Sequence, residues 1–140
     1  MNAANNNELE TTPTVTVDLE RLTEYLAGRP CVVAATVFGS ASDGKVQPGS
    51  DLDLAILFET KPEPQEFLQF YSDLCDEMPR VQNVDVVILN DADPILAFEA
   101  ISGRFLCKNN LPKTAAFFSL VCREYEDVMG NLEHQQRLRV

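Results

Sequence analysis

The fold is decided by residues 39–53, which read Gly-Ser-Ala-Ser-Asp-Gly-Lys-Val-Gln-Pro-Gly-Ser-Asp-Leu-Asp. Residues 31–38 before this stretch are a continuous β-prone run, and residues 51–58 form a second apolar run that opens with two aspartates. Both runs are predicted to be strands buried in a sheet. The glycines, serines and proline between them interrupt regular structure and predict a long turn.

Asp51 and Asp53 open the second predicted strand. Residues two apart in a strand point to the same face, so the two carboxylates stand side by side while Leu52 points into the core. Like charges this close raise each other's pKa unless a cation lies between them. Carboxylate oxygens favour Mg²⁺ or Mn²⁺ as that cation. The pair therefore predicts a metal site, and the structural alternative is a solvated strand end.

Three further residues add to this site. Asp85 lies in the middle of an otherwise apolar strand, where an unpaired charge is costly to bury, so it is a candidate third carboxylate. The alternative for Asp85 is an edge strand on which it faces water. Gly39 and Ser40 follow the first strand, and a glycine at this turn lets backbone N–H groups approach a phosphate closely. Together these residues predict nucleotidyl or phosphoryl transfer.

The remaining pattern predicts an α/β (α+β) fold with a small mixed sheet of about four strands flanked by helices. Helices are expected over residues 18–28, 62–78, 94–102 and 114–129, the first capped by Asp18 and the third by Asp93, with strands over 84–89 and 104–107. Residues 1–15 are expected to be a flexible tail, residues 16–130 the single domain, and residues 131–140 a C-terminal tail.

Composition and charge limit the classes of partner. The chain has 140 residues, enough for one domain, and no apolar run approaches the roughly 20 residues that cross a bilayer. A start without basic or apolar character, and four separated cysteines expected to be reduced and buried, predict a cytoplasmic protein. The net charge of −11 gives no help in binding nucleic acid. Neither nucleic acid nor membrane is therefore expected as a partner, and a homo-oligomer stays open.

The motif resembles that of a known family. Gly39-Ser40, ten residues and then Asp51-Leu52-Asp53 resemble the GSx₁₀DxD signature of the DNA polymerase beta nucleotidyltransferase superfamily. The likeness is greatest to its minimal nucleotidyltransferase (MNT) domains, some of which are antitoxins paired with HEPN-domain toxins. Residues 84–89 resemble the strand that carries the family's third aspartate, and residues 93–107 resemble the helix and strand that follow it.

The resemblance implies the nucleotidyltransferase fold and a role for each motif residue. Gly39 and Ser40 would bind the triphosphate of ATP. Asp51 and Asp53 would hold two Mg²⁺ ions, for which Mn²⁺ could substitute, and Asp85 would complete one metal site and help to activate the attacking hydroxyl. AMP would pass to a hydroxyl of a HEPN toxin, and pyrophosphate would leave.

One position departs from the family pattern. Members usually read GSxARG at this turn, whereas Asp43 stands here in place of the arginine. An anion beside a triphosphate weakens binding or changes its geometry, although Lys45 is near enough in sequence to compensate. Two alternatives therefore stay open: a catalytically weak or inactive domain that neutralises its partner by stoichiometric binding, and a small-molecule nucleotidyltransferase of the aminoglycoside-modifying type.

Overall fold

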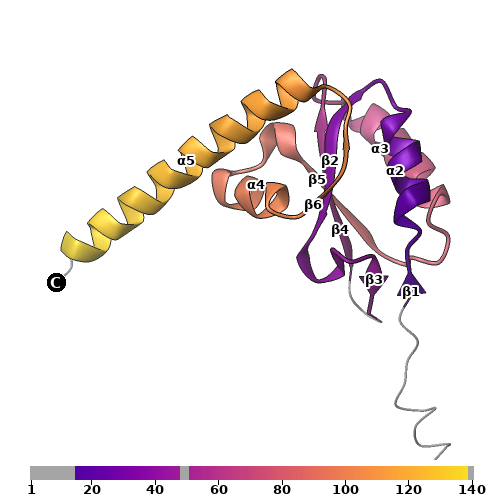
Figure 1. Cartoon of the computed structure of the whole chain (residues 1–140), viewed down its shortest axis with the longest axis horizontal. Helices are drawn as coiled ribbons and strands as arrows, with labels where there is room; N and C mark the ends of the chain where they lie inside the picture. Colours follow the sequence, from indigo (N-terminus) through magenta and orange to yellow (C-terminus); the bar gives the residue numbers. More distant parts are fainter. Residues whose placement is uncertain (1–14, 48–50, 139–140) are drawn as a thin grey trace, which may run out of the picture.

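The chain folds around one four-stranded mixed sheet (Figure 1). The computed structural model describes residues 15–47 and 51–138. The sheet contains, in spatial order, β5 (Val84–Ile88), β4 (Leu52–Phe58), β2 (Val32–Phe38) and β6 (Arg104–Lys108). β4 and β5 run parallel, and β2 is antiparallel to both β4 and β6. The predicted mixed sheet of about four strands is confirmed.

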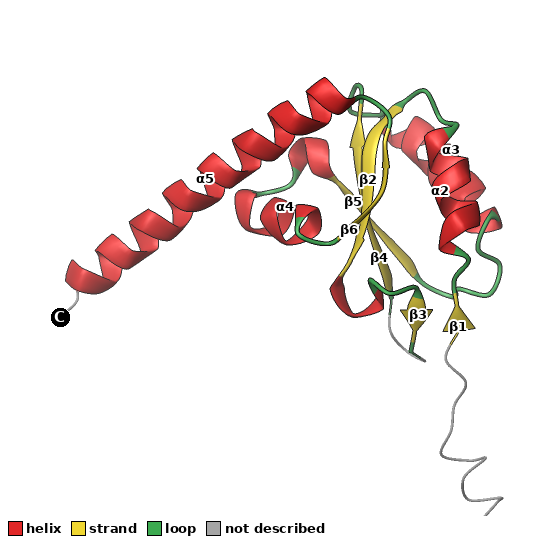
Figure 2. Ribbon diagram, in the orientation of Figure 1, coloured by secondary structure: helices red, strands yellow, loops and turns green. Residues whose placement is uncertain are grey.

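Helices cover both faces of this sheet (Figure 2). The helices α2 (Leu19–Ala27) and α3 (Pro64–Asp76) pack on one face and build the larger core cluster. The helices α4 (Pro94–Ile101) and α5 (Leu111–Leu138) lie on the other face, over a second cluster. Every residue of β2 is buried, because this strand has neighbours on both edges and helices on both faces. That burial explains its unbroken apolar sequence.

The helices begin where the sequence places their capping residues. The carboxylate of Asp18 accepts a hydrogen bond from the backbone N–H of Arg21 at 3.1 Å, at the start of α2. The carboxylate of Asp93 accepts one from the N–H of Leu96 at 2.9 Å, with Pro94 in the first turn of α4. Each carboxylate satisfies a helix N–H that has no partner within the helix, so both predicted caps are confirmed.

The largest differences from the sequence prediction are the length of the last helix and the presence of two short strands. The last helix begins at Leu111 instead of Thr114 and continues to Leu138, so residues 131–138, assigned to a tail, are helical. Two short strands, β1 (Val15–Thr16) and β3 (Lys45–Val46), pair with each other and were not predicted. Two residues are too few to show an alternating pattern. The rest of the predicted N-terminal tail, residues 1–14, lies outside the described residues, as do residues 48–50 and 139–140.

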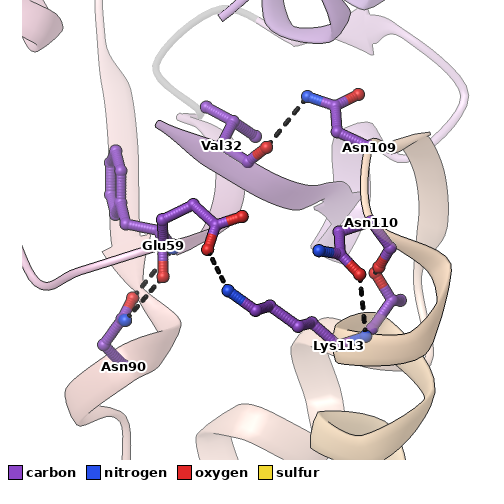
Figure 3. A network of polar contacts seen from close by, with 8 residues as sticks. Val32, Glu59, Asn90, Asn109, Asn110 and Lys113 are labelled. Atoms are coloured by element: carbon purple, nitrogen blue, oxygen red, sulfur yellow. Dashed lines mark hydrogen bonds and ion pairs between the residues drawn. The ribbon is translucent and has the colours of Figure 1, made fainter. Parts of the chain in front are cut away.

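A polar network fastens the start of α5 to the sheet beside Val32, the first residue of β2 (Figure 3). The side-chain N–H₂ group of Asn109 donates to the carbonyls of Leu26 at 3.1 Å and Val32 at 2.9 Å. Lys113, in the first turn of α5, forms an ion pair with Glu59 just beyond β4. These contacts tie the start of α5 to α2, to the first residue of β2 and to the residue after β4.

The cysteines only partly follow expectation. All four are free thiols; Cys107 is buried, and burial raises the pKa of its thiol to about 11. Cys31 is exposed because it lies in the turn before β2, so the expectation that it is buried is wrong. Among residues 15–47 and 51–138, no helix combines the length and the apolar character that crossing a membrane requires.

Candidate functional site

Two of the three predicted carboxylates lie opposite each other in the sheet. Asp53 of β4 and Asp85 of β5 are register partners in the parallel pair. The neighbours of Asp53 on β4, Leu52 and Leu54, belong to the core under α2 and α3. Successive strand residues alternate between faces, so Asp53 and Asp85 project on the side of α4. Asp51 precedes Asp53 by two residues and stays exposed at the end of the strand.

The turn after β2 brings backbone against Asp53. Gly39 has a φ of +74°, in the region that favours glycine. A Cβ built on Gly39 would lie 2.6 Å from Oδ2 of Asp53, so only glycine leaves room for this carboxylate. Phe38 supports the approach because it is the register partner of Asp53 in the antiparallel pair. Ser40, exposed in the 3₁₀ turn Gly39–Ala41, lies beside this contact in the chain.

The surroundings of Asp53 raise the pKa of its carboxyl group. Its pKa is raised above the ordinary value of 3.8, first by burial and then by the negative charges of Asp85, Asp51 and Glu99. Each of these three carboxylates disfavours the ionised form of Asp53. The charges of Asp51 and Asp85, two of the residues that the sequence predicts for the site, therefore act on Asp53.

Glu99 was not among the predicted site residues. It lies on α4, the helix above the face to which Asp53 projects, and its charge contributes to the raised pKa of Asp53. The carbonyl of the next residue, Ala100, accepts a hydrogen bond at 2.9 Å from Oγ1 of Thr36, which holds α4 against β2. One signal was available in the sequence, because Glu99 is the only charged residue within the otherwise apolar α4.

We call Asp51, Asp53 and Asp85 the carboxylate corner. Their carboxylate oxygens are the kind of ligand that Mg²⁺ and Mn²⁺ prefer. Within residues 15–47 and 51–138, ion pairs join Arg21 to Glu77, Lys61 to Asp91 and Lys113 to Glu59, so none of them neutralises this corner. In that same part of the chain, no three acidic, histidine or cysteine side chains are close enough together to hold a metal ion as they stand. A shared ion would therefore need side-chain rotations, most simply of the exposed Asp51 and Asp85.

Asp43 has a structural role in the turn. Its carboxylate accepts a hydrogen bond from the backbone N–H of Lys45 at 3.0 Å. Gly44 between them has a φ of +85°, and its carbonyl accepts from the N–H of Val17 at 2.8 Å. Asp43 thus stabilises the turn that brings β3 beside β1.

Arg104 projects from the face of the sheet opposite to Asp53 and Asp85. It is the register partner of Val37, whose side chain lies in the core under α2 and α3. Register partners point to the same face, so Arg104 projects away from the carboxylate face. It lines a hollow together with Glu20 and Glu24 of α2. Its side chain is exposed to solvent.

Known structures share this fold. A crystal structure of a toxin–antitoxin with AMP-PNP matches with a TM-score of 0.68 and 18% identity over 86% of this chain and 97% of the other. An MNT antitoxin in complex with a tri-AMPylated HEPN toxin of Shewanella oneidensis matches with a TM-score of 0.62 and 17% identity, over 85% and 93%. A MntA–HepT toxin–antitoxin matches with a TM-score of 0.62 and 16% identity, over 85% and 94%.

Sequence comparison gives the family. No curated protein matches the chain. The family model described as polymerase beta, nucleotidyltransferase matches residues 20–111, from the first turn of α2 to the start of α5. That span includes the motif turn, both aspartate-bearing strands and α4. The chain belongs to the polymerase beta nucleotidyltransferase family.

Proposed function

We propose that this chain is the antitoxin of a toxin–antitoxin pair and that it transfers AMP from ATP to a hydroxyl group of a HEPN toxin. One observation carries the proposal: Asp53 and Asp85 face each other across parallel strands, with the Gly39 turn in contact with Asp53. The fold neighbours support the choice of nucleotide and partner, since they include a complex with AMP-PNP and one with an AMPylated HEPN toxin.

The positions of the residues support a role for each of them. Backbone N–H groups at Gly39 and Ser40 bind the triphosphate, because the glycine allows close approach. Asp51, Asp53 and Asp85 hold the divalent ions, which when bound neutralise the charge of the phosphates. Their donor chemistry supports this assignment. The raised pKa of Asp53 agrees with it, since burial raises this pKa first and a cation would relieve the repulsion by neighbouring carboxylates that raises it further.

The transfer needs no reactant other than ATP and the acceptor hydroxyl. The hydroxyl oxygen of the acceptor forms a bond to the α-phosphorus of ATP, and the bond from that phosphorus to the oxygen bridging to the β-phosphate breaks. Pyrophosphate leaves with the bonding electron pair. Asp85 accepts the proton of the hydroxyl, because this exposed carboxylate lies beside Asp53 and is open to a macromolecular acceptor.

Transfer of label from [α-³²P]ATP to a purified HEPN toxin tests the proposal. Wild type with Mg²⁺ should label the toxin, and Asp53→Asn should lower the rate by at least about a hundredfold. Circular dichroism establishes that the variant is folded. Equal labelling by Asp53→Asn and wild type would refute the assigned site.

A second candidate is stoichiometric neutralisation without catalysis. Asp43 favours it, because this anion replaces the family arginine and its carboxylate is engaged in the turn. Toxin inhibition by the Asp53→Asn variant separates the two candidates. Full protection by that variant, with no label transferred by wild type under any divalent metal, would favour simple binding.

A further inference from the structure

The helix α5 carries a second apolar row besides the one that covers its own domain. Val121 is buried in the second core cluster, and Phe117 packs against that cluster. Thr114 is also buried against the rest of the domain, which we call the body. A different row follows at alternating spacings of four and three residues, the spacing by which coiled-coil helices meet. This row, which we call the seam, contains Leu111, Ala115, Phe118, Cys122, Tyr125, Met129, Leu132 and Gln136.

The body leaves most of the seam uncovered. Two seam residues also contact the domain: Cys122 packs against the second core cluster, and the ring of Tyr125 stacks on Phe98 of α4 with centroids 3.9 Å apart and an interplanar angle of 9°. On either side of these contacts, Phe118 is 41% exposed and Leu132 is 44% exposed. Large apolar side chains in a regular row, open to solvent over several turns, are typical of a protein-binding surface.

The end of α5 lacks internal support. With 28 residues at about 1.5 Å each, the helix is roughly 42 Å long, and its C-terminal end projects beyond the rest of the molecule (Figure 1). Gly130 lies within this projecting part, where a Cβ would meet no atom within 4 Å beyond the helix itself. Glycine weakens a helix interior by about 1 kcal/mol, and short unsupported helices are marginal in water. Packing on a partner would stabilise this segment.

The charges beside the seam decide which partner fits. Its body-side edge contains Val121 and Val128, whereas its free edge contains Glu126 and Glu133. In an antiparallel pair of two α5 helices, the free edges would face each other and bring these glutamates together. In a parallel pair, the free edge would face Val121 of the other copy, which is buried on that copy's own body. Self-association is therefore disfavoured in both directions.

We infer that the seam of α5 docks a helix of a different protein, one with an apolar row flanked by lysine or arginine. The net charge of −11 also favours such a partner, since a negatively charged protein attracts a basic one. The inference rests on the proposed function for the identity of this partner, a HEPN toxin. It places the toxin contact on α5, on the same side of the sheet as α4 and the carboxylates.

Binding of a purified HEPN toxin to three variants tests the seam. Phe118→Glu and Leu132→Glu should each weaken binding by about tenfold or more, because they place a charge in the contact. Leu120→Glu is the matched control: Leu120 is 43% exposed but lies on the opposite side of the helix from the seam, so its effect should be less than about twofold. All three should keep wild-type binding of Mg²⁺–ATP, which separates loss of docking from loss of the nucleotide site.

A synthetic helical peptide separates the seam from the identity of the toxin. It carries leucine in its apolar row and lysine at the flanking positions, and a second peptide carries glutamate there. One outcome is that the lysine peptide binds, that Phe118→Glu weakens this binding, and that neither the glutamate peptide nor the toxin binds. This outcome would support the seam and refute a HEPN toxin as its partner. The inference is overturned if Phe118→Glu binds as tightly as Leu120→Glu, if wild type binds neither ligand, or if wild type sediments as a dimer that Phe118→Glu dissociates.

Discussion

Asp53 of β4 lies directly opposite Asp85 of β5, and the backbone of Gly39 leaves no room for a Cβ beside the Asp53 carboxylate. This arrangement brings together three residues, Gly39, Asp53 and Asp85, that are up to 46 positions apart in the chain. It depends on the parallel pairing of β4 with β5, because a shift of one residue would turn one carboxylate to the other face.

Replacement of Asp53 should stabilise the metal-free protein. The pKa of Asp53 is raised in the folded state, so ionisation opposes folding, and stability falls as pH rises from below 3.8 through the raised value. Asp53→Asn removes this penalty and should therefore raise the free energy of unfolding at pH 7. Urea titrations from pH 3 to pH 8 without metal would measure the difference. A difference that did not shrink toward low pH would mean that ionisation of Asp53 is not its source.

Replacement of Gly39 should displace the Asp53 carboxylate. A Cβ 2.6 Å from Oδ2 of Asp53, on a residue with φ of +74°, forces the turn or the carboxylate to move. Gly39→Ala should cost about 1–3 kcal/mol of stability and abolish Mg²⁺–ATP binding in calorimetry. Gly130→Ala is the control and should be slightly stabilising, since this glycine lies within a helix with open space around it. Unchanged nucleotide binding in Gly39→Ala would argue against phosphate binding at this turn.

Replacing Asp43 with arginine, the residue that the family resemblance implies here, should separate the effect of this side chain on turn stability from the effect of its charge on ATP binding. Asp43→Arg loses the hydrogen bond from the N–H of Lys45 and should destabilise the turn by about 1 kcal/mol. The new cation should nevertheless tighten ATP binding by a few-fold. Asp43→Asn keeps an oxygen acceptor and should preserve stability. If Asp43→Arg weakened ATP binding while thermal melting showed it folded, the turn would not be adjacent to the phosphates.

Removal of Asn109 should destabilise the protein more than removal of the nearby ion pair. Its side-chain N–H₂ group donates to two backbone carbonyls, of Leu26 and Val32, so Asn109→Ala should cost about 2 kcal/mol. Lys113→Met removes an exposed ion pair with Glu59 and should cost less than about 1 kcal/mol. Chemical denaturation of both variants measures the ranking. The reverse order would mean that the ion pair, and not Asn109, holds α5 to the sheet.

Much of the fold and site could be predicted because local signals agreed with the tertiary structure. Asp18 and Asp93 mark helix starts through short-range hydrogen bonds, and strand alternation turns Asp53 to the face opposite to Leu52 and Leu54. These features depend on neighbouring residues or on strand periodicity, which a sequence displays directly.

Other features depend on long-range contacts that no local pattern displays. The face on which Arg104 lies is set by its register with Val37, and Glu99 reaches the site only because α4 packs above β4. The length of α5 was underestimated because its last nine residues, with Gly130 among them, are predominantly polar. The seam on that helix was indicated only by the adjacent Phe117 and Phe118, which cannot share one narrow face.

The most direct test of the carboxylate corner is Mn²⁺ binding followed by electron paramagnetic resonance, with a non-hydrolysable ATP analogue present. Wild type should remove free Mn²⁺ from solution in the presence of the analogue, and Asp53→Asn and Asp85→Asn should each weaken that binding by about tenfold or more. Equal Mn²⁺ binding by wild type and both variants, with all three folded, would contradict the assignment of Asp53 and Asp85 as the metal–nucleotide site.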